Sequence, residues 1–197
     1  MLVILLLLSL LSSAQEGGEK VLKVHFLYGS KPRKAFRESE EKYFGGIHGG
    51  HVTIEVDGMI FGFSPKDGFH YISHYRHRLS SFSERECKEW SKDTASRKYT
   101  SIIIPISLDD YLKLKSIREN YLKNTPYDYA FLGMRCAAAT ADVLSQISIG
   151  KKRSKAGLVL HNFFPQPLRR RMLYLASIKK YTVVKHEGRV SRKWENE

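Results

Sequence analysis

Cysteine is scarce in this chain: Cys87 and Cys136 are the only two among 197 residues. Small secreted domains that fold around disulfides carry many more cysteines, and a chain of this length can bury a core of its own. A disulfide framework is therefore excluded as the basis of the fold, although a single Cys87–Cys136 disulfide remains one of two interpretations. The alternative is that at least one of the two thiols is chemically active.

Signatures of bound cofactors are also missing. The chain has no glycine-rich phosphate loop, no HExxH and no paired CxxC, so we expect no nucleotide, no metal and no other cofactor. His70, His74 and His77 have the spacing of one helix face, which would suit a metal site. Their stretch, FHYISHYRHR, has no neighbouring cysteine or carboxylate ligand, and this favours a loop that lines a cleft.

Acidic residues are few, 20 against 33 lysines and arginines, and the formal net charge is +13. The basic residues concentrate in the C-terminal third, at 151–155, 168–171 and 179–193. This balance favours an anionic partner, and for an exported chain a membrane surface or an acidic wall polymer is more accessible than nucleic acid, which we do not expect. The other interpretation is that these runs are solvated faces.

The one long apolar run stands at the start, in MLVILLLLSLLSSAQ. Ser12 and Ala14 provide small residues for cleavage before Gln15, which predicts a secretory signal peptide over residues 1–14. The run is too short for a stable membrane anchor, and no lipoprotein cysteine follows it. We therefore expect an exported protein, periplasmic or secreted, whose residues 15–197 form one domain without internal repeats or linkers.

Apolar patterning predicts strands and helices in a mixed order. Strands are expected at 21–29, 51–56, 59–64 and 99–107. Helices are expected over 80–92, from a capping box at Ser107 and Asp110 to about residue 124, from Cys136 onward, and around 167–179. A basic C-terminal hairpin that turns at Glu187-Gly188 completes the chain.

The clearest local signal is the Asp57-Gly58 dipeptide between two apolar strands, which is typical of a two-residue hairpin turn. The pairs that a tight turn predicts are Val56–Met59, Glu55–Ile60, Ile54–Phe61, Thr53–Gly62, Val52–Phe63 and His51–Ser64. One face of the hairpin is then wholly apolar. On the other face Ser64 is close enough to His51 to orient its imidazole, and Gly62 leaves an open spot.

Cys136 is expected at the N-terminus of a helix, where unpaired N–H groups and the helix dipole favour a thiolate. Cys87 lies in the charged stretch SERECKEW and has no comparable setting. A thiolate at a helix start and a histidine at a strand start make a nucleophile and base pair. The alternative for Cys136 is a small buried residue in an alanine-rich helix.

GGHVTIEVDG, followed far downstream by PYDYAFLGMRC, resembles the circularly permuted branch of the papain-like NlpC superfamily, which includes YiiX-like bacterial proteins and lecithin:retinol acyltransferase-like enzymes. The resemblance covers residues 45–147. It implies an α+β, papain-like fold of NlpC type in which an antiparallel sheet packs against helices. It also implies Cys136 as nucleophile, His51 as general base, a polar third residue, and a tyrosine upstream of the cysteine, for which Tyr127 is the match and Tyr129 the reserve.

The chain departs from this family at several positions. Many YiiX-like members have Ser-Glu after the cysteine, whereas Ala137 and Ala138 follow here. The third residue is often a histidine or an acid, whereas strand pairing offers Ser64, with Glu55 two pleats away as the second choice. We expect Tyr129, Glu55 and His48 to contact the substrate.

The mechanism that the resemblance implies is acyl transfer. Cys136 attacks an amide or ester carbonyl, His51 takes and returns the proton, and the N–H of Cys136 meets the oxyanion together with Tyr127. We expect an exported, monomeric cysteine amidase or peptidase that acts on peptidoglycan peptides or on lipid-like acyl substrates. Two alternatives remain: a catalytically silent basic module that binds an anionic envelope polymer or membrane, and a thiol acyltransferase or lipid hydrolase.

Overall fold

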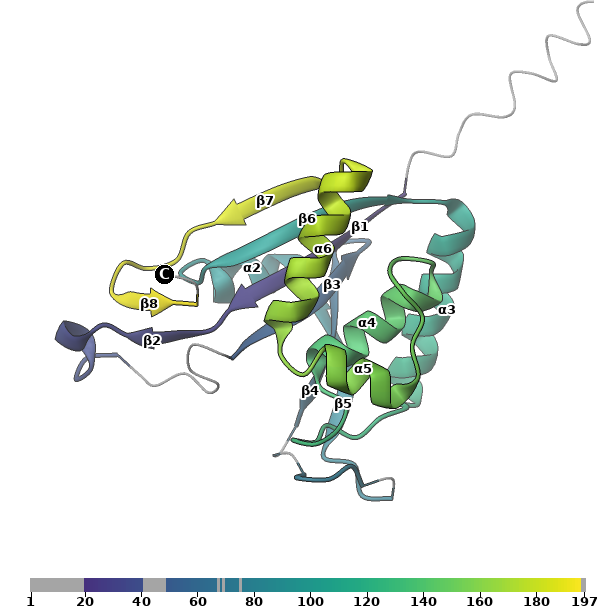
Figure 1. The fold of residues 1–197 in the computed structure, drawn as a ribbon, viewed down its shortest axis with the longest axis horizontal. Helices are drawn as coiled ribbons and strands as arrows, with labels where there is room; N and C mark the ends of the chain where they lie inside the picture. Colours follow the sequence, from purple (N-terminus) through teal and green to yellow (C-terminus); the bar gives the residue numbers. More distant parts are fainter. Residues whose placement is uncertain (1–19, 41–48, 67, 69, 75, 196–197) are drawn as a thin grey trace, which may run out of the picture.

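An antiparallel sheet of six strands crosses the protein in the order β5-β4-β3-β1-β6-β7 (Figure 1). The computed structural model describes residues 20–40, 49–66, 68, 70–74 and 76–195. The strands of this sheet are β1 Lys20–Tyr28, β3 Gly50–Val56, β4 Met59–Pro65, β5 Ser80–Glu86, β6 Tyr99–Ile106 and β7 Thr182–His186. A second sheet pairs β2 Ser30–Pro32 with β8 Arg192–Trp194. The helices are η1 Lys34–Phe36, α2 Cys87–Thr94, α3 Leu108–Lys123, α4 Cys136–Gln146, α5 Lys155–His161 and α6 Pro165–Lys179.

Side chains alternate along each strand, so every strand contributes residues to both faces of the sheet. On β1, Leu22 and Val24 are fully buried in the main core. His25 points to the opposite face, where its ring lies 4.6 Å from that of Trp90 in α2. The main core therefore lies between the sheet and helices α4 and α6, while α2 covers the β4 and β5 side of the other face.

The α+β architecture expected from the sequence is confirmed, and a helix does begin at Cys136. The predicted hairpin turn is present: Asp57 and Gly58 have φ of 52° and 72°, the left-handed region that a type I′ turn requires. The cap of α3 is present as well, because the Ser107 hydroxyl accepts a hydrogen bond from the N–H of Asp110 at 3.1 Å.

The register of the hairpin is confirmed only next to the turn. The pairs Val56–Met59, Glu55–Ile60 and Ile54–Phe61 are present. Among the described residues the pairing of β3 with β4 ends there, so the predicted pairing of His51 with Ser64 is wrong. β4 instead continues against β5, where Ser64 pairs with Ser81.

Two further expectations are wrong. Segment 80–92 is not one helix, because Ser80–Glu86 forms the edge strand β5 with Phe82 buried in the core, and α2 begins only at Cys87. The C-terminal hairpin is also not formed: β7 pairs with β6, and β8 pairs with β2. The residues near Gly188 connect the two sheets instead of closing a hairpin.

Part of the basic C-terminal third is structural. Arg169 is only 2% exposed, hydrogen-bonds to both carboxylate oxygens of Glu195 at 3.2 and 3.0 Å, and lies 3.7 Å over the ring of Tyr28. Arg192, also 2% exposed, pairs with Glu40 at 2.7 Å. These two charges hold the C-terminal segment to the rest of the fold and do not contribute to a solvated basic face.

Two sequence-based expectations lie outside the described residues: the signal peptide over residues 1–14, and His48 as a substrate contact. Within the described part of the chain, none of the helices combines the length and apolar character needed to cross a bilayer.

Candidate active site

Cys136 is the first residue of α4. The preceding residue, Arg135, is extended, with φ −127° and ψ 173°, and no side chain caps the helix. The first N–H groups of a helix have no partner within it, and with the helix dipole they favour an anion at this position. The next three residues, Ala137, Ala138 and Ala139, are buried, so the start of the helix packs closely against the sheet.

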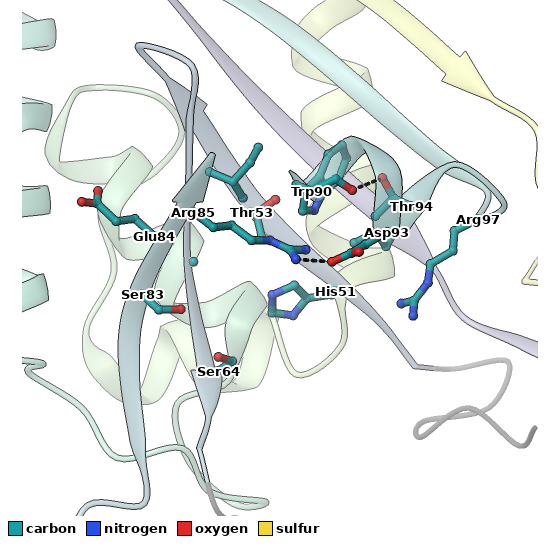
Figure 2. A pocket seen from close by; sticks show the side chains of 13 residues that line it. His51, Thr53, Ser64, Ser83, Glu84, Arg85, Trp90, Asp93, Thr94 and Arg97 are labelled. Carbon is teal, nitrogen blue, oxygen red and sulfur yellow. Dashed lines mark hydrogen bonds and ion pairs between the residues drawn. The ribbon is translucent and has the colours of Figure 1, made fainter. Parts of the chain in front are cut away.

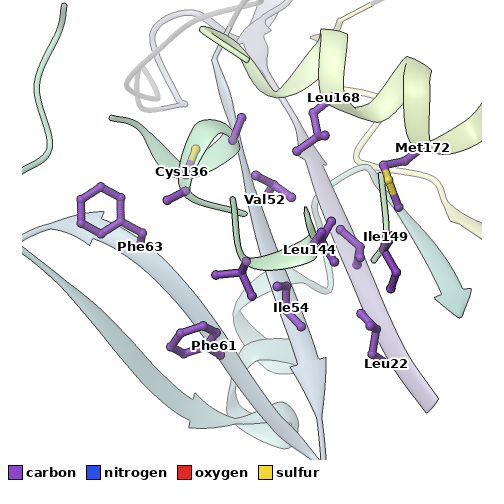
Figure 3. Close-up of a cluster of buried hydrophobic side chains, with 14 of the residues drawn as sticks. Leu22, Val52, Ile54, Phe61, Phe63, Cys136, Leu144, Ile149, Leu168 and Met172 are labelled. Atoms are coloured by element: carbon purple, nitrogen blue, oxygen red, sulfur yellow. The ribbon is translucent and has the colours of Figure 1, made fainter. Parts of the chain in front are cut away.

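The thiol of Cys136 meets the imidazole of His51 on β3. The two side chains are hydrogen-bonded, and the main-chain N–H of Val52 also donates to the sulfur. The pairing of β3 with β4 extends from the turn only to Ile54 and Phe61, so His51 lies beyond the paired part of the hairpin. Figure 3 shows Cys136 between Val52 of β3 and Phe63 of β4. His51 on β3 and the first residue of α4 therefore meet beyond the paired part of the β3–β4 hairpin.

Electrostatics at this position favour the thiolate. Cys136 is 3% exposed, and burial by itself would raise its pKa. The charge and hydrogen bond of His51, the N–H of Val52 and the charge of Arg135 outweigh burial, so the pKa of Cys136 lies below its ordinary value. The thiolate is the nucleophilic form of cysteine, so this arrangement prepares Cys136 for attack on a carbonyl.

Tyr129 is the tyrosine beside the thiol. Its side chain hydrogen-bonds to both Cys136 and Arg135. Burial, followed by the charge of Cys136, raises the pKa of Tyr129 to about 12, so its hydroxyl stays protonated at neutral pH. A protonated hydroxyl that is hydrogen-bonded to the nucleophile can donate to an oxyanion formed on a bound carbonyl.

The structure does not bring Tyr127, the first choice from the sequence, to the thiol. Its buried ring packs against Phe63 with the centroids 5.9 Å apart, and its hydroxyl bonds to Asp142 and lies 3.3 Å from that of Tyr121. Burial and the bond with Asp142 raise the pKa of Tyr127. Helices α3 and α4 thus supply polar partners that turn this hydroxyl away, and Tyr129 takes the expected position.

Glu55 belongs to a separate cluster on the face that α2 covers. Its carboxylate is 2.7 Å from Nζ of Lys23, 2.9 Å from Nε2 of His25 and 3.3 Å from Sγ of Cys87. The hydrogen bond with His25 is the main cause that lowers the pKa of Glu55 to about 2. These partners keep Glu55 away from His51, so it does not act as the third residue of the site.

Cys87 differs from Cys136 although it also begins a helix, which the sequence did not suggest. Burial and the neighbouring Glu55 raise the pKa of Cys87, so its thiol stays protonated. Both cysteines are free, and the Cys87–Cys136 disulfide considered from the sequence is not formed. The two thiols therefore have opposite chemical character.

A cavity of about 600 Å³ has His51 in its wall and opens on the face opposite α4 (Figure 2). Ser64 lines the same cavity, but no hydrogen bond joins it to His51 in the part of the chain that the structure describes. A Cβ atom at Gly62 would lie 3.0 Å from Cγ2 of Thr53 and 3.7 Å from Nε2 of His51, so the glycine allows the Thr53 side chain to pack close to β4 beside His51. Cys136 is not among the described residues that line the cavity, whereas its hydrogen-bond partner His51 is.

The histidine-rich loop packs beside the segment that leads to Cys136. Asp128 holds this loop by accepting from Nδ1 of His70 and the N–H of His74, each at 2.7 Å. The rings of His70, His74 and His77 follow one another at 5.5 and 5.6 Å, but the described part of the loop is not helical. Over the described residues no group of three histidine, cysteine or acidic side chains could hold a metal ion.

Arg135 also belongs to the site, although no sequence motif indicates it: it contacts Tyr129 and contributes charge to the thiol. Its place directly before Cys136 was the only available signal. No protein-family model matches this chain, and neither the search of curated proteins nor that of solved structures returns a match. The functional assignment therefore depends on the chemistry of the site itself.

Proposed function

We propose that this protein is a thiol-dependent hydrolase of amides, an amidase or peptidase in which Cys136 is the nucleophile and His51 the general base. The observation that carries the proposal is the hydrogen bond between these two side chains at the start of α4, which lowers the pKa of Cys136 in spite of its burial. A perturbed thiol with a basic partner is typical of catalytic cysteines.

The reaction proceeds by acyl transfer. The Cys136 thiolate forms a bond to the substrate carbonyl carbon, and the oxyanion receives hydrogen bonds from the N–H of Cys136 and the hydroxyl of Tyr129. The C–N bond then breaks as protonated His51 gives its proton to the leaving amine. Water attacks the resulting thioester and gives a proton to His51. The C–S bond then breaks, which releases the acid and restores the Cys136 thiolate beside protonated His51.

The order of the site residues supports a permuted papain-like relationship. His51 lies on a strand of an antiparallel sheet, and Cys136 follows it in sequence at the start of a helix that packs on the same sheet. This is the order expected from the motifs GGHVTIEVDG and PYDYAFLGMRC. We extend the proposal to an exported enzyme that acts on peptide or acyl substrates of the cell envelope, because of the apolar run over residues 1–14 and the net charge of +13.

An acyl-enzyme trap tests the proposed function. The protein is mixed with p-nitrophenyl acetate and with an N-acetyl amino acid p-nitroanilide, release of the chromophore is followed, and the quenched protein is analysed by mass spectrometry. On the peptide that contains Cys136, we expect an acetyl adduct from the ester and an N-acetyl aminoacyl adduct from the anilide.

Two alanine variants provide a matched pair for this test. Cys136→Ala should lose both the adduct and turnover, whereas Cys87→Ala should keep both, because only the first thiol has a lowered pKa. Turnover that survives in Cys136→Ala, or an adduct on Cys87, would contradict the assignment. Hydrolysis of the ester but not of the anilide would exclude an amidase and favour an esterase.

A further inference from the structure

Arg135 holds its guanidinium beside the nucleophile, among three aromatic rings. Its Cζ atom lies 4.7 Å from the ring centroid of Phe163, 5.4 Å from that of Phe164 and 5.9 Å from that of Phe131. A guanidinium stacks favourably on aromatic faces and keeps its N–H groups in the plane of the group for other partners. The rings therefore fix the position of the charge without using its hydrogen bonds.

One part of this guanidinium is unsatisfied. Nη1 of Arg135 is buried and has no hydrogen-bond partner, while the side chain bonds to Tyr129. Within the described ranges, no carboxylate forms an ion pair with Arg135, in contrast to the buried Arg169 and Arg192, each of which has a glutamate. Buried donors in native proteins are almost always paired, so an orphaned N–H of a charged group points to a missing acceptor.

The position of Arg135 connects that missing acceptor to the reaction. Arg135 directly precedes Cys136 in the chain, and Tyr129 hydrogen-bonds to both residues. The aromatic enclosure also reaches the surface, because Phe131 and Phe164 are 44% and 38% exposed. A ligand group that enters between these rings would bind next to the carbonyl that Cys136 attacks.

We propose that Arg135 binds a carboxylate of the substrate, so that the preferred substrates are short acidic peptides or N-acyl amino acids whose carboxylate lies close to the scissile carbonyl. This inference rests on the proposed function for its link to turnover, and the binding of a carboxylate can be measured without it. A carboxylate matches the planar fork of a guanidinium, and the charge-assisted bond satisfies the N–H that the protein leaves unpaired.

Two alkylating reagents of nearly equal size test the proposal. Iodoacetate carries a carboxylate and iodoacetamide a neutral amide, and both alkylate thiols. We expect the iodoacetate to iodoacetamide rate ratio at Cys136 to fall by about tenfold in Arg135→Gln, because a charge-assisted pair with the reagent is lost. Arg135→Lys should keep an intermediate ratio, since it retains the charge but not the fork.

Arg135 also affects the general reactivity of the Cys136 thiol, but that effect changes the rates of both reagents equally. It therefore cancels in the iodoacetate to iodoacetamide rate ratio. The ratio at Cys87, measured in the same samples, is the internal control and should not change. An unchanged ratio at Cys136 in Arg135→Gln would overturn the proposal even if Cys136 remains the reactive thiol.

A binding measurement separates this proposal from the proposed function. Titration calorimetry of the Cys136→Ala variant with N-acetylglycine should show binding that N-acetylglycinamide lacks and that the additional change Arg135→Gln removes. Equal binding of the two compounds, or binding that survives Arg135→Gln, would contradict carboxylate recognition. Carboxylate binding at Arg135 in a protein without turnover would refute the hydrolase and leave the anion site in place.

Discussion

Replacement of Glu55 by glutamine gives a quantitative test of the buried cluster under α2. The pKa of Glu55 is lowered from 4.5 to about 2 in the folded protein, chiefly by its hydrogen bond with His25, and the residue is only 8% exposed. One pKa unit corresponds to about 1.4 kcal/mol, so the ionised carboxylate stabilises the fold by about 3 kcal/mol at pH 7.

The contribution of Glu55 depends on pH in a defined direction. Because its pKa is lower in the folded state, the stabilisation is fully present above pH 4.5 and is lost as the pH falls towards 2. At pH 3 about 1 kcal/mol of it remains, so wild type should lose about 2 kcal/mol between pH 7 and pH 3 from this group alone.

Urea denaturation at several pH values between 2 and 7 measures the effect. Glu55→Gln should have a lower unfolding free energy than wild type at pH 7, and the difference should shrink by about 2 kcal/mol by pH 3, since glutamine does not titrate. Glu187→Gln is the control, because the carboxylate of Glu187 is 74% exposed although it pairs with Lys98. If the difference between wild type and Glu55→Gln stays constant with pH, the pKa of Glu55 is not lowered in the folded protein. Alkylation of Cys136 should be unaffected by Glu55→Gln.

Three other substitutions test separate parts of the account. Tyr129→Phe should lower kcat by about tenfold to a hundredfold in assays of p-nitroanilide hydrolysis, because an oxyanion donor is removed; an unchanged kcat would exclude that role. Tyr127→Phe should instead lower the unfolding free energy by about 1 kcal/mol and spare kcat, because the Tyr127 hydroxyl bonds to Asp142. A larger loss of kcat in Tyr127→Phe than in Tyr129→Phe would reverse the roles of the two tyrosines. Glu195→Gln should reduce the unfolding free energy by about 3 kcal/mol or more, since Arg169 is left buried without its counter-charge; a loss below 1 kcal/mol in urea denaturation would show that the ion pair is not needed.

The parts of the fold that could be predicted from the sequence are those set by neighbouring residues. The turn at Asp57-Gly58 needs two residues that tolerate positive φ, and that requirement is readable in the dipeptide itself. The cap at Ser107 is equally local, since its partner Asp110 is three residues away. Cys136 could be placed at a helix start because the turn before it and the alanines after it are adjacent in the chain.

The parts that could not be predicted depend on contacts between distant segments. From Ile54 towards His51 the alternating pattern predicts that β3 and β4 stay paired. In the structure the pairing ends at Ile54, where α4 packs against both strands. The choice between Tyr127 and Tyr129 depends on Asp142, which lies on another element and offers one hydroxyl a partner. The rings around Arg135 come partly from residues 163 and 164, far along the chain, so the sequence offered no local signal for that enclosure.

The pH dependence of alkylation at Cys136 shows whether His51 activates this thiol. In a Cys87→Ser background, the rate of reaction with iodoacetamide is measured from pH 5 to pH 10, with His51 intact and in the additional variant His51→Gln. We predict a half-maximal rate below about pH 8.5, the value of an ordinary thiol, and a shift to higher pH when His51 is replaced. A half-maximal rate at or above about pH 8.5 that does not respond to His51→Gln would show that Cys136 is not an activated nucleophile and would contradict the account.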